Sequence, residues 1–409
     1  MTAASLAVPR LRAQAARAAI DLSAVLPLDG FTVAGPLHVR VLVLDDGAAR
    51  LALAVVELTS LFPETLALLK AELAAITGAQ ETVIWASHTF CAPHAFTASH
   101  PAADNAAQTR VRAQRLADSL LAATREAGAR AAGDLRPARL GYAAGRCPIA
   151  VNRDVETPAG WWLGADPRGP VDPDVGVLAV TDADGATIAV VVCCAVQSSV
   201  LARTRAPDGS RRVSGDLAGA VAAGVEAGSP GAVALWLTGT AADQAPVFSA
   251  PSASADSGQE LLDLLAGRLT AEVLRTRTEI RPDDPPRRWL LRRGYVDVPA
   301  QVPPRSLDDL HPDRHHRFVS SGRTTLPYLV LELGPVTVVG TQAELTVTTG
   351  AQLRTAAATP LMVTTMADGA AKYLADAAGY DRRTYAAMNS RYGRGAAELL
   401  VAELGHVLS

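Results

Sequence analysis

The chain has 409 residues, of which 49% are hydrophobic and 19% are charged, and its formal net charge is −3. So small a net charge gives no electrostatic basis for binding nucleic acid or an anionic membrane. At about 150 residues per domain, this length suggests two or three domains, although a single large α/β domain is also common. No apolar run reaches the roughly 18 residues that cross a bilayer, so we expect no membrane span.

The cysteines and the N-terminal segment indicate a cellular compartment. The chain has four cysteines, Cys91, Cys147, Cys193 and Cys194, and their spacing matches no zinc ribbon and no CxxC redox motif. Reduced thiols are therefore expected. The N-terminal segment lacks the continuous apolar stretch of a signal peptide. Both features favour a cytoplasmic location.

The first part of the chain predicts a β-β-α-β unit. Residues 38–58 are expected to form a hairpin, because two β-rich runs flank an Asp-Gly turn. An amphipathic helix then begins at Pro63 and stops before Gly78. Residues 81–87 read as a short buried strand, which places His88 at its carboxyl end. Ligands of α/β sheets usually bind at this edge.

The rest of the chain alternates hairpins, strands and helices. The expected elements are a helix over 106–132, a hairpin over 175–196, a strand over 232–239, a helix over 260–274, a hairpin over 328–341, a helix over 343–354, a strand over 361–367 and a terminal helix over 395–408. This order predicts an α/β (mixed α+β) fold with mixed sheets built from hairpins and flanked by helices. Polar residues at three strand ends, namely His88, Gln197 with the nearby segment TAADQAP, and the segment TQAE, predict one shared pocket.

Several residues are candidate metal ligands or nucleophiles by their residue type. His88 is a candidate zinc ligand, although a histidine at a strand end is at least as often structural or solvated. Cys91 could be a nucleophile with His88 or His94 as its base, but burial as a small hydrophobic residue is the commoner state of cysteine. Cys193 and Cys194 lie within a strand and are expected in the core. The sequence contains no GxSxG, P-loop or GxGxxG motif.

Motifs in order along the chain indicate a family. They are ARAAIDLSAVLPLDGF, IWASHTFCAPH, AVNRD, AVVVCCAVQSSV, SGDLAGAV, LWLTGTAADQAP, VVGTQAELTVTTGAQLR and the closing passage from MADGAAKYLADAAGY to YGRGAAELL. Each motif is weak alone, but their shared order resembles the N-terminal catalytic domain of the neutral/alkaline ceramidase family over nearly the whole chain. The resemblance implies one ceramidase-like catalytic domain over 1–409, open to a division into lobes at about 1–280 and 281–409. The immunoglobulin-like C-terminal domain of secreted ceramidases is not expected.

The resemblance also implies a zinc site that has changed. In the family, two histidines, a glutamate and a tyrosine hold one zinc ion; these positions fall on His88, Glu344 and Tyr373, with Gln197 in place of the second histidine. An amide oxygen is a weak zinc donor, so a degenerate zinc site is implied. The family's second motif histidine is replaced by Phe90, a serine by Ala245, and the glycine-rich SGPGG by CAPHA.

Roles for individual residues follow from the same resemblance. His88, Glu344 and Tyr373 are candidates for general acid or base, and Arg153 for binding a carboxylate or an oxyanion. Cys91 and His94 remain candidate catalytic residues. On residue type alone, Glu344 would also suit a helix N-terminus and Tyr373 a core position.

The implied function is that of a ceramidase-like amidohydrolase or related enzyme acting on the carbonyl–nitrogen bond of a small or acyl-chain amide. Two alternatives stay open. One is a metal-independent acid/base or cysteine-dependent cyclase or transferase of bacterial specialised metabolism. The other is a non-catalytic relative that binds a ligand in the same pocket. A homodimer is also left open, with a small-molecule or acyl-amide substrate as the expected partner.

Overall fold

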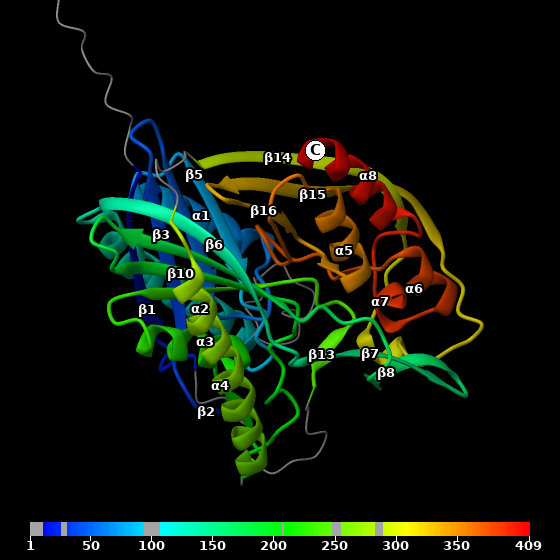
Figure 1. The fold of residues 1–409 in the computed structure, drawn as a ribbon. Coiled ribbons are helices and arrows are strands. Elements are labelled where there is room, and N and C mark those ends of the chain that lie inside the picture. The colour runs from blue at the N-terminus through cyan, green and yellow to red at the C-terminus, as the bar shows by residue number, and fades with distance from the viewer. Residues whose placement is uncertain (1–10, 26–30, 94–106, 207, 248–254, 283–288) are drawn as a thin grey trace, which may run out of the picture.

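The computed structural model describes residues 11–25, 31–93, 107–206, 208–247, 255–282 and 289–409. Two β-sheets pack face to face, and helices cover the outer face of each (Figure 1). The α/β (mixed α+β) expectation is thereby confirmed. Within the described residues, no helix is both long enough and apolar enough to cross a bilayer.

The larger sheet has eight strands in the order β12-β10-β9-β6-β1-β3-β4-β5. It contains the hairpins expected over 38–58 and 175–196, together with parallel β4–β5 and β10–β12 pairs. Its strands are β1 (Arg12–Ile20), β3 (Leu37–Asp45), β4 (Arg50–Val56), β5 (Glu81–Ala86), β6 (Arg136–Arg146), β9 (Asp174–Asp182), β10 (Thr187–Cys194) and β12 (Val233–Thr238). Alternate side chains enter opposite cores, so the central strands are apolar on both faces.

Helices cover one face of this sheet. They are α1 (Pro63–Thr77), α2 (Ala107–Ala132), α3 (Asp216–Ala227) and α4 (Ala255–Glu279). Leu69 and Leu73 of α1 meet Leu120 of α2 over strands β3–β5, while α3 and α4 enclose a second core over β9, β10 and β12. As expected, Pro63 begins α1, and Gly78 ends it with a left-handed φ of 65°.

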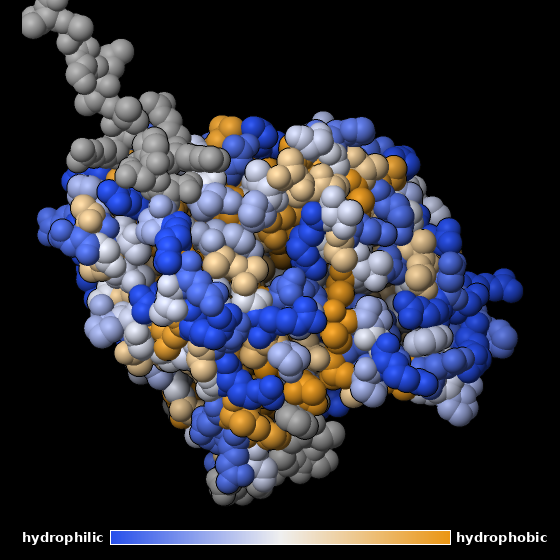
Figure 2. Space-filling model, viewed as in Figure 1, coloured by the Kyte–Doolittle hydropathy of each residue, from blue (hydrophilic) through white to orange (hydrophobic). Residues whose placement is uncertain are grey.

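The smaller sheet faces the other side of the larger one. It consists of β14 (Trp289–Gln301), β15 (Ser320–Leu333), β16 (Val336–Thr341) and β18 (Leu361–Thr364). Leu331 and Met362 pack with Trp85 in the core between the sheets. Helices α5 (Val347–Ala356) and α8 (Ala396–Leu408) cover its outer face. In the space-filling view, apolar side chains gather near the middle of the face shown, and hydrophilic ones dominate its edges (Figure 2).

Short elements complete the fold. They are the strands β2 (Phe31–Val33), β7 (Ala150–Thr157), β8 (Gly160–Asp166), β11 (Arg211–Val213), β13 (Gln244–Pro246), β17 (Glu344–Leu345) and β19 (Tyr373–Leu374), the 3₁₀ helix η2 (Leu307–Asp309), and the helices α6 (Ala377–Arg382) and α7 (Tyr385–Met388). They form three small sheets, β11-β2, β13-β7-β8 and β17-β19, and these lie where the long strands end.

The structure corrects the expected start of the helix that follows β17. A helix was expected over 343–354, but α5 begins at Val347 with Thr346 as its N-cap. The Thr346 side chain accepts a hydrogen bond from the backbone N–H of Thr349, which fixes the start of the helix. Glu344 therefore lies in β17 and not in the first helical turn, so a helix N-terminal role for its carboxylate is wrong.

Candidate functional site

Two short parallel pairings bring distant segments together. Thr89 pairs with Ser198 after strands β5 and β10 have ended, which sets the neighbouring residues His88 and Gln197 side by side. Glu344 pairs with Tyr373 across β17 and β19. The polar ends of distant strands thus meet in one place, as the sequence predicted.

Each ring nitrogen of His88 has a polar neighbour. Nδ1 lies 2.7 Å from the carbonyl oxygen of Thr59, which can only accept, so Nδ1 carries a proton. Nε2 lies 3.2 Å from Oε2 of Glu344. The backbone of His88 has a φ of 59°, a left-handed conformation that is uncommon for a residue other than glycine. Only Nε2 is therefore available to exchange a proton.

Gln197 bridges a cation and an anion. Nη1 of Arg153 donates a hydrogen bond to Oε1 of Gln197 at 3.0 Å. Nε2 of Gln197 donates to Oε2 of Glu344 at 3.1 Å. The reverse amide orientation would set acceptor against acceptor and donor against donor, so the partners define which atom is which. The amide oxygen thus faces the guanidinium.

Arg153 lies among aromatic rings. Its guanidinium carbon is 5.3 Å from the centre of the Tyr373 ring and 5.8 Å from that of Tyr385. A guanidinium at this range of a ring face makes a cation–π interaction. We call His88, Arg153, Gln197, Glu344 and Tyr373 the polar cluster; each is at most 8% exposed.

The charges in the polar cluster stabilise one another. Burial alone would raise the pKa of Glu344, but the charges of His88 and Arg153 hold it below its ordinary value. Burial alone would lower the pKa of His88, and Glu344 outweighs this effect and raises it. Burial raises the pKa of Tyr373, with Glu344 adding to the effect, so its phenol stays protonated. The cluster thus holds a Glu344–His88 ion pair beside the permanent charge of Arg153.

Three buried donors in the polar cluster have no hydrogen-bond partner of acceptable geometry. They are Nε2 of His88, which lies 3.2 Å from Glu344 without good alignment, and Nε and Nη2 of Arg153, although the Tyr373 hydroxyl lies close enough to interact with this guanidinium. Buried polar groups are nearly always satisfied, and an unsatisfied one costs about 1–3 kcal/mol. Such donors suit a group that brings an oxygen into the cluster.

Cys91 has other partners. Its thiol donates to Oδ2 of Asp216 at 3.3 Å, and burial, followed by the charge of Asp216, raises its pKa. This environment disfavours the thiolate that a nucleophile needs. The preceding residue, Phe90, packs edge to face against His88, with the ring centres 4.8 Å apart. His94 lies outside the described residues. Cys193 and Cys194 are buried, as expected.

Sequence reasoning did not name two residues that support the polar cluster. Asp243 accepts from the backbone N–H of Val347 at 3.0 Å and from Nδ2 of Asn152 at 3.2 Å, so it ties the start of α5 to β7. Tyr385 packs edge to face against Tyr373, with the ring centres 5.8 Å apart. Asp243 belongs to the segment TAADQAP, which the sequence places near the shared pocket without marking a particular residue in it.

The arrangement does not make the expected zinc site. Among the described residues, no group of three or more His, Cys, Asp or Glu side chains could hold a metal ion. Gln197 turns its amide nitrogen, which cannot bind a metal, toward Glu344, while Arg153 occupies its oxygen. Arg153 also places a fixed positive charge beside the donors. As arranged, His88, Gln197, Glu344 and Tyr373 do not fit a zinc ion.

Comparisons with known proteins identify the fold. No protein-family model matches the sequence, and no curated protein matches it. Among solved structures, a ceramidase complexed with C2 aligns with a TM-score of 0.74 at 16% identity, covering 98% of this chain and 74% of that one. A neutral ceramidase from Pseudomonas aeruginosa aligns with a TM-score of 0.73 at 16% identity, covering 98% and 73%. The chain therefore has a ceramidase-like α/β fold.

Proposed function

We propose that the protein is an enzyme that hydrolyses the carbonyl–nitrogen bond of an acyl amide, with the polar cluster as its reaction centre. The observation that carries this proposal is the set of three buried donors without a well-aligned acceptor, on His88 and Arg153, beside the Glu344 carboxylate. Donors fixed in a water-poor site stabilise an oxygen that becomes negative in the transition state. The ceramidase-like fold supports the choice of an amide as substrate.

The reaction begins with attack of a water oxygen on the carbonyl carbon. The electron pair of the C=O bond moves to the carbonyl oxygen, which Arg153 stabilises through its unsatisfied N–H groups. The water proton passes to Glu344, whose depressed pKa keeps it ionised before the reaction.

Breakdown of the tetrahedral intermediate follows. The C–N bond breaks as the nitrogen takes the Nε2 proton of His88, and the oxygen re-forms its double bond. Glu344 then returns a proton to Nε2, so the cluster is regenerated and the products are a carboxylic acid and an amine. Thr59 keeps the imidazole oriented through Nδ1. Tyr373 positions Arg153 under its ring.

Amine release from a panel of N-acyl amides with different acyl lengths tests this proposal. The wild-type protein should release amine from at least one of them, and Glu344→Gln should abolish the release. Glu332→Gln is a matched control, because Glu332 is 44% exposed in its pair with Arg292. Absence of release from every amide, or equal rates in wild type and Glu344→Gln, would overturn the proposal.

A further inference from the structure

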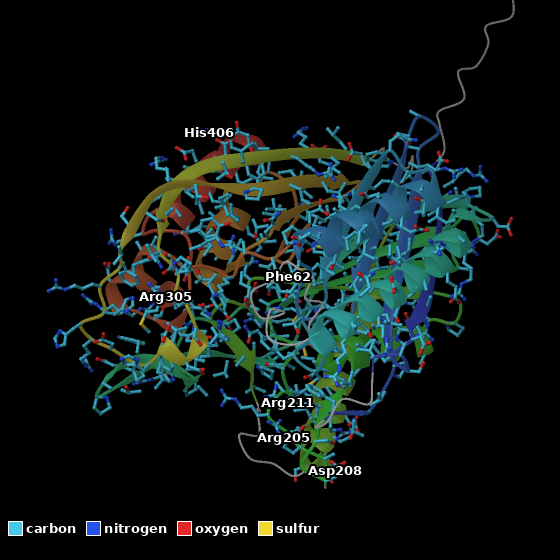
Figure 3. The ribbon with its side chains drawn as sticks, turned by 180° about the vertical axis from the view of Figure 1, so that it is seen from behind. Phe62, Arg205, Asp208, Arg211, Arg305 and His406 are labelled. Atoms are coloured by element: carbon cyan, nitrogen blue, oxygen red, sulfur yellow. The ribbon has the colours of Figure 1, made fainter. Side chains whose placement is uncertain are left out.

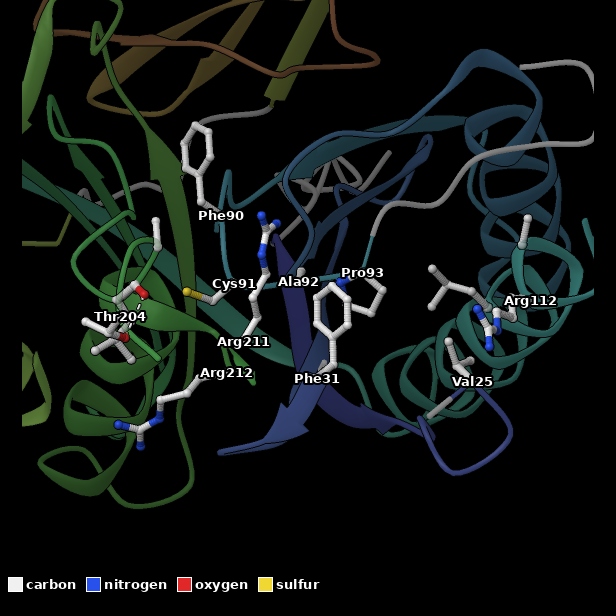
Figure 4. Close-up of a pocket in the computed structure, with 14 residues that line it drawn as sticks. Val25, Phe31, Phe90, Cys91, Ala92, Pro93, Arg112, Thr204, Arg211 and Arg212 are labelled. Carbon is white, nitrogen blue, oxygen red and sulfur yellow. Dashed lines mark hydrogen bonds between the residues drawn. The ribbon is translucent and has the colours of Figure 1, made fainter. Parts of the chain in front are cut away.

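A cavity partly lined by Phe90 lies close to the polar cluster, since the Phe90 ring also packs on His88. Its volume is about 200 Å³, below the roughly 300 Å³ of most small-molecule pockets. It therefore suits a small ligand or one end of a larger one. Phe31, Phe90, Pro93 and Leu116 contribute apolar wall (Figure 4).

Arginines are the charged residues of this cavity. Arg112, Arg211 and Arg212 line it, and no Asp or Glu is among the described residues that do. Arg211 and Phe31 are register partners in the parallel β2–β11 pair, so their side chains leave the same face of that small sheet. In the close-up, Arg211 lies between the rings of Phe90 and Phe31, while Arg212 turns to the other side (Figure 4).

The carboxylate of Asp216, beside the lining residue Cys91, interacts with groups other than these arginines. Asp216 lies behind Cys91, where its oxygens accept from the thiol and from the backbone N–H groups of Val200, Leu201 and Leu217. Neither Arg112 nor Arg211 forms an ion pair within the described residues, whereas Arg212 donates to Gln259. Arg112 and Arg211 thus bring positive charge to an apolar cavity from opposite walls.

We propose that this cavity binds an organic anion that joins a carboxylate or phosphate group to a short apolar body. The anion would lie against Arg211 and Arg112, because guanidinium groups bind both oxyanions through paired N–H groups. The apolar body would lie against Phe31 and Phe90. This inference holds whether or not the polar cluster is catalytic.

Calorimetric titration of the full chain at low salt tests the proposal with four probes: hexanoate, hexyl phosphate, 1-hexanol and hexylammonium. At least one of the two anions should bind, with affinity falling as salt is added, and the alcohol and the ammonium should bind more weakly. Preference for hexanoate would assign the site to carboxylates, and preference for hexyl phosphate to phosphate esters.

Charge-neutral variants make the test specific to the cavity. Arg211→Gln should weaken anion binding about tenfold or more, and Arg112→Gln should weaken it as well. Arg305→Gln is the control, since Arg305 is exposed and lies far from Arg211 across the molecule (Figure 3); it should leave binding unchanged. Thermal unfolding checks that the variants fold. Millimolar anions that fail to bind, equal affinity in Arg211→Gln, or equal binding of hexylammonium would overturn the proposal.

Discussion

The protein buries two arginines in opposite ways. Arg40, 2% exposed, pairs with Glu57 and with Glu226, and no buried polar atom of these three residues lacks a partner. Arg153, 8% exposed, donates to Gln197 and lies against the Tyr373 hydroxyl, and two of its buried nitrogens lack a well-aligned acceptor. The first arrangement joins β3 to α3 and is complete in itself. The second is incomplete without a further acceptor, which is what a site for a ligand requires.

The largest expected effect is on stability at Arg40. Arg40→Met leaves Glu57 buried without its charged partner, and it should lower the free energy of unfolding by about 3–5 kcal/mol. Chemical denaturation measures this loss. The double variant Arg40→Met/Glu57→Gln should recover part of it, since no unpaired charge then remains at that pair. A loss below about 1 kcal/mol in the single variant would contradict a structural role for the Arg40 group.

Arg153 should show the reverse behaviour. Arg153→Lys keeps the charge but removes the planar set of donors, so kcat should fall by about 10²–10³. The free energy of unfolding should change much less than in Arg40→Met, because the Glu344 carboxylate keeps His88 as its charged partner. Steady-state kinetics together with denaturation separate the two effects. Unchanged kcat, or an unfolding loss as large as that of Arg40→Met, would remove the distinction between the two arginines.

Asp154 provides a pH test beside Arg153. Burial, followed by the charge of Asp243, raises its pKa to about 6. Because its folded pKa lies above the unfolded value, Asp154 contributes most to stability below about pH 4. This contribution, up to about 3 kcal/mol, is lost as the pH rises from about 4 through 6. Asp154→Asn should therefore stabilise the protein at pH 8 by about 1–3 kcal/mol and have little effect near pH 4. Chemical denaturation of wild type and Asp154→Asn at pH 4 and pH 8 measures the difference. An equal effect of the substitution at the two pH values would argue against the raised pKa of Asp154.

The smallest expected effect is at Cys91. Cys91→Ala removes one hydrogen bond to Asp216, which keeps those from Val200, Leu201 and Leu217. Amide hydrolysis should stay within about twofold of wild type, because a thiol of raised pKa is a poor nucleophile. A large loss of kcat in a folded variant would restore the cysteine-dependent alternative.

The sequence predicted the fold well where local patterns were strong. The hairpins of β3–β4, β9–β10 and β15–β16 have apolar runs and short turns, and helix α1 has Pro63 and Gly78 at its ends. Strand β1 was not predicted, because RAQAARAAI is rich in alanine, which has low strand propensity. Strand β14 was not predicted either, since many of its side chains are exposed or half-buried and its polar residues hide the alternation.

The candidate site was predicted in part. Polar strand ends and the family resemblance together placed His88, Gln197 and Glu344 in one pocket, and the structure brings them together. The orientation of the Gln197 side-chain amide and the burial of Arg153 against the Tyr373 ring depend on segments that meet only after folding. For the same reason, no local pattern marked the ion pairs of Arg40 or the cavity that Arg211 shares with Phe31.

Amide hydrolysis by chelator-treated protein, with its metal content measured on the same sample, tests most directly whether the polar cluster is the reaction centre without zinc. We predict that the metal-free sample releases amine from an N-acyl amide at the rate of the untreated protein. Loss of the activity on chelation, followed by recovery with added zinc, would contradict the account, as would the absence of amine release before any treatment.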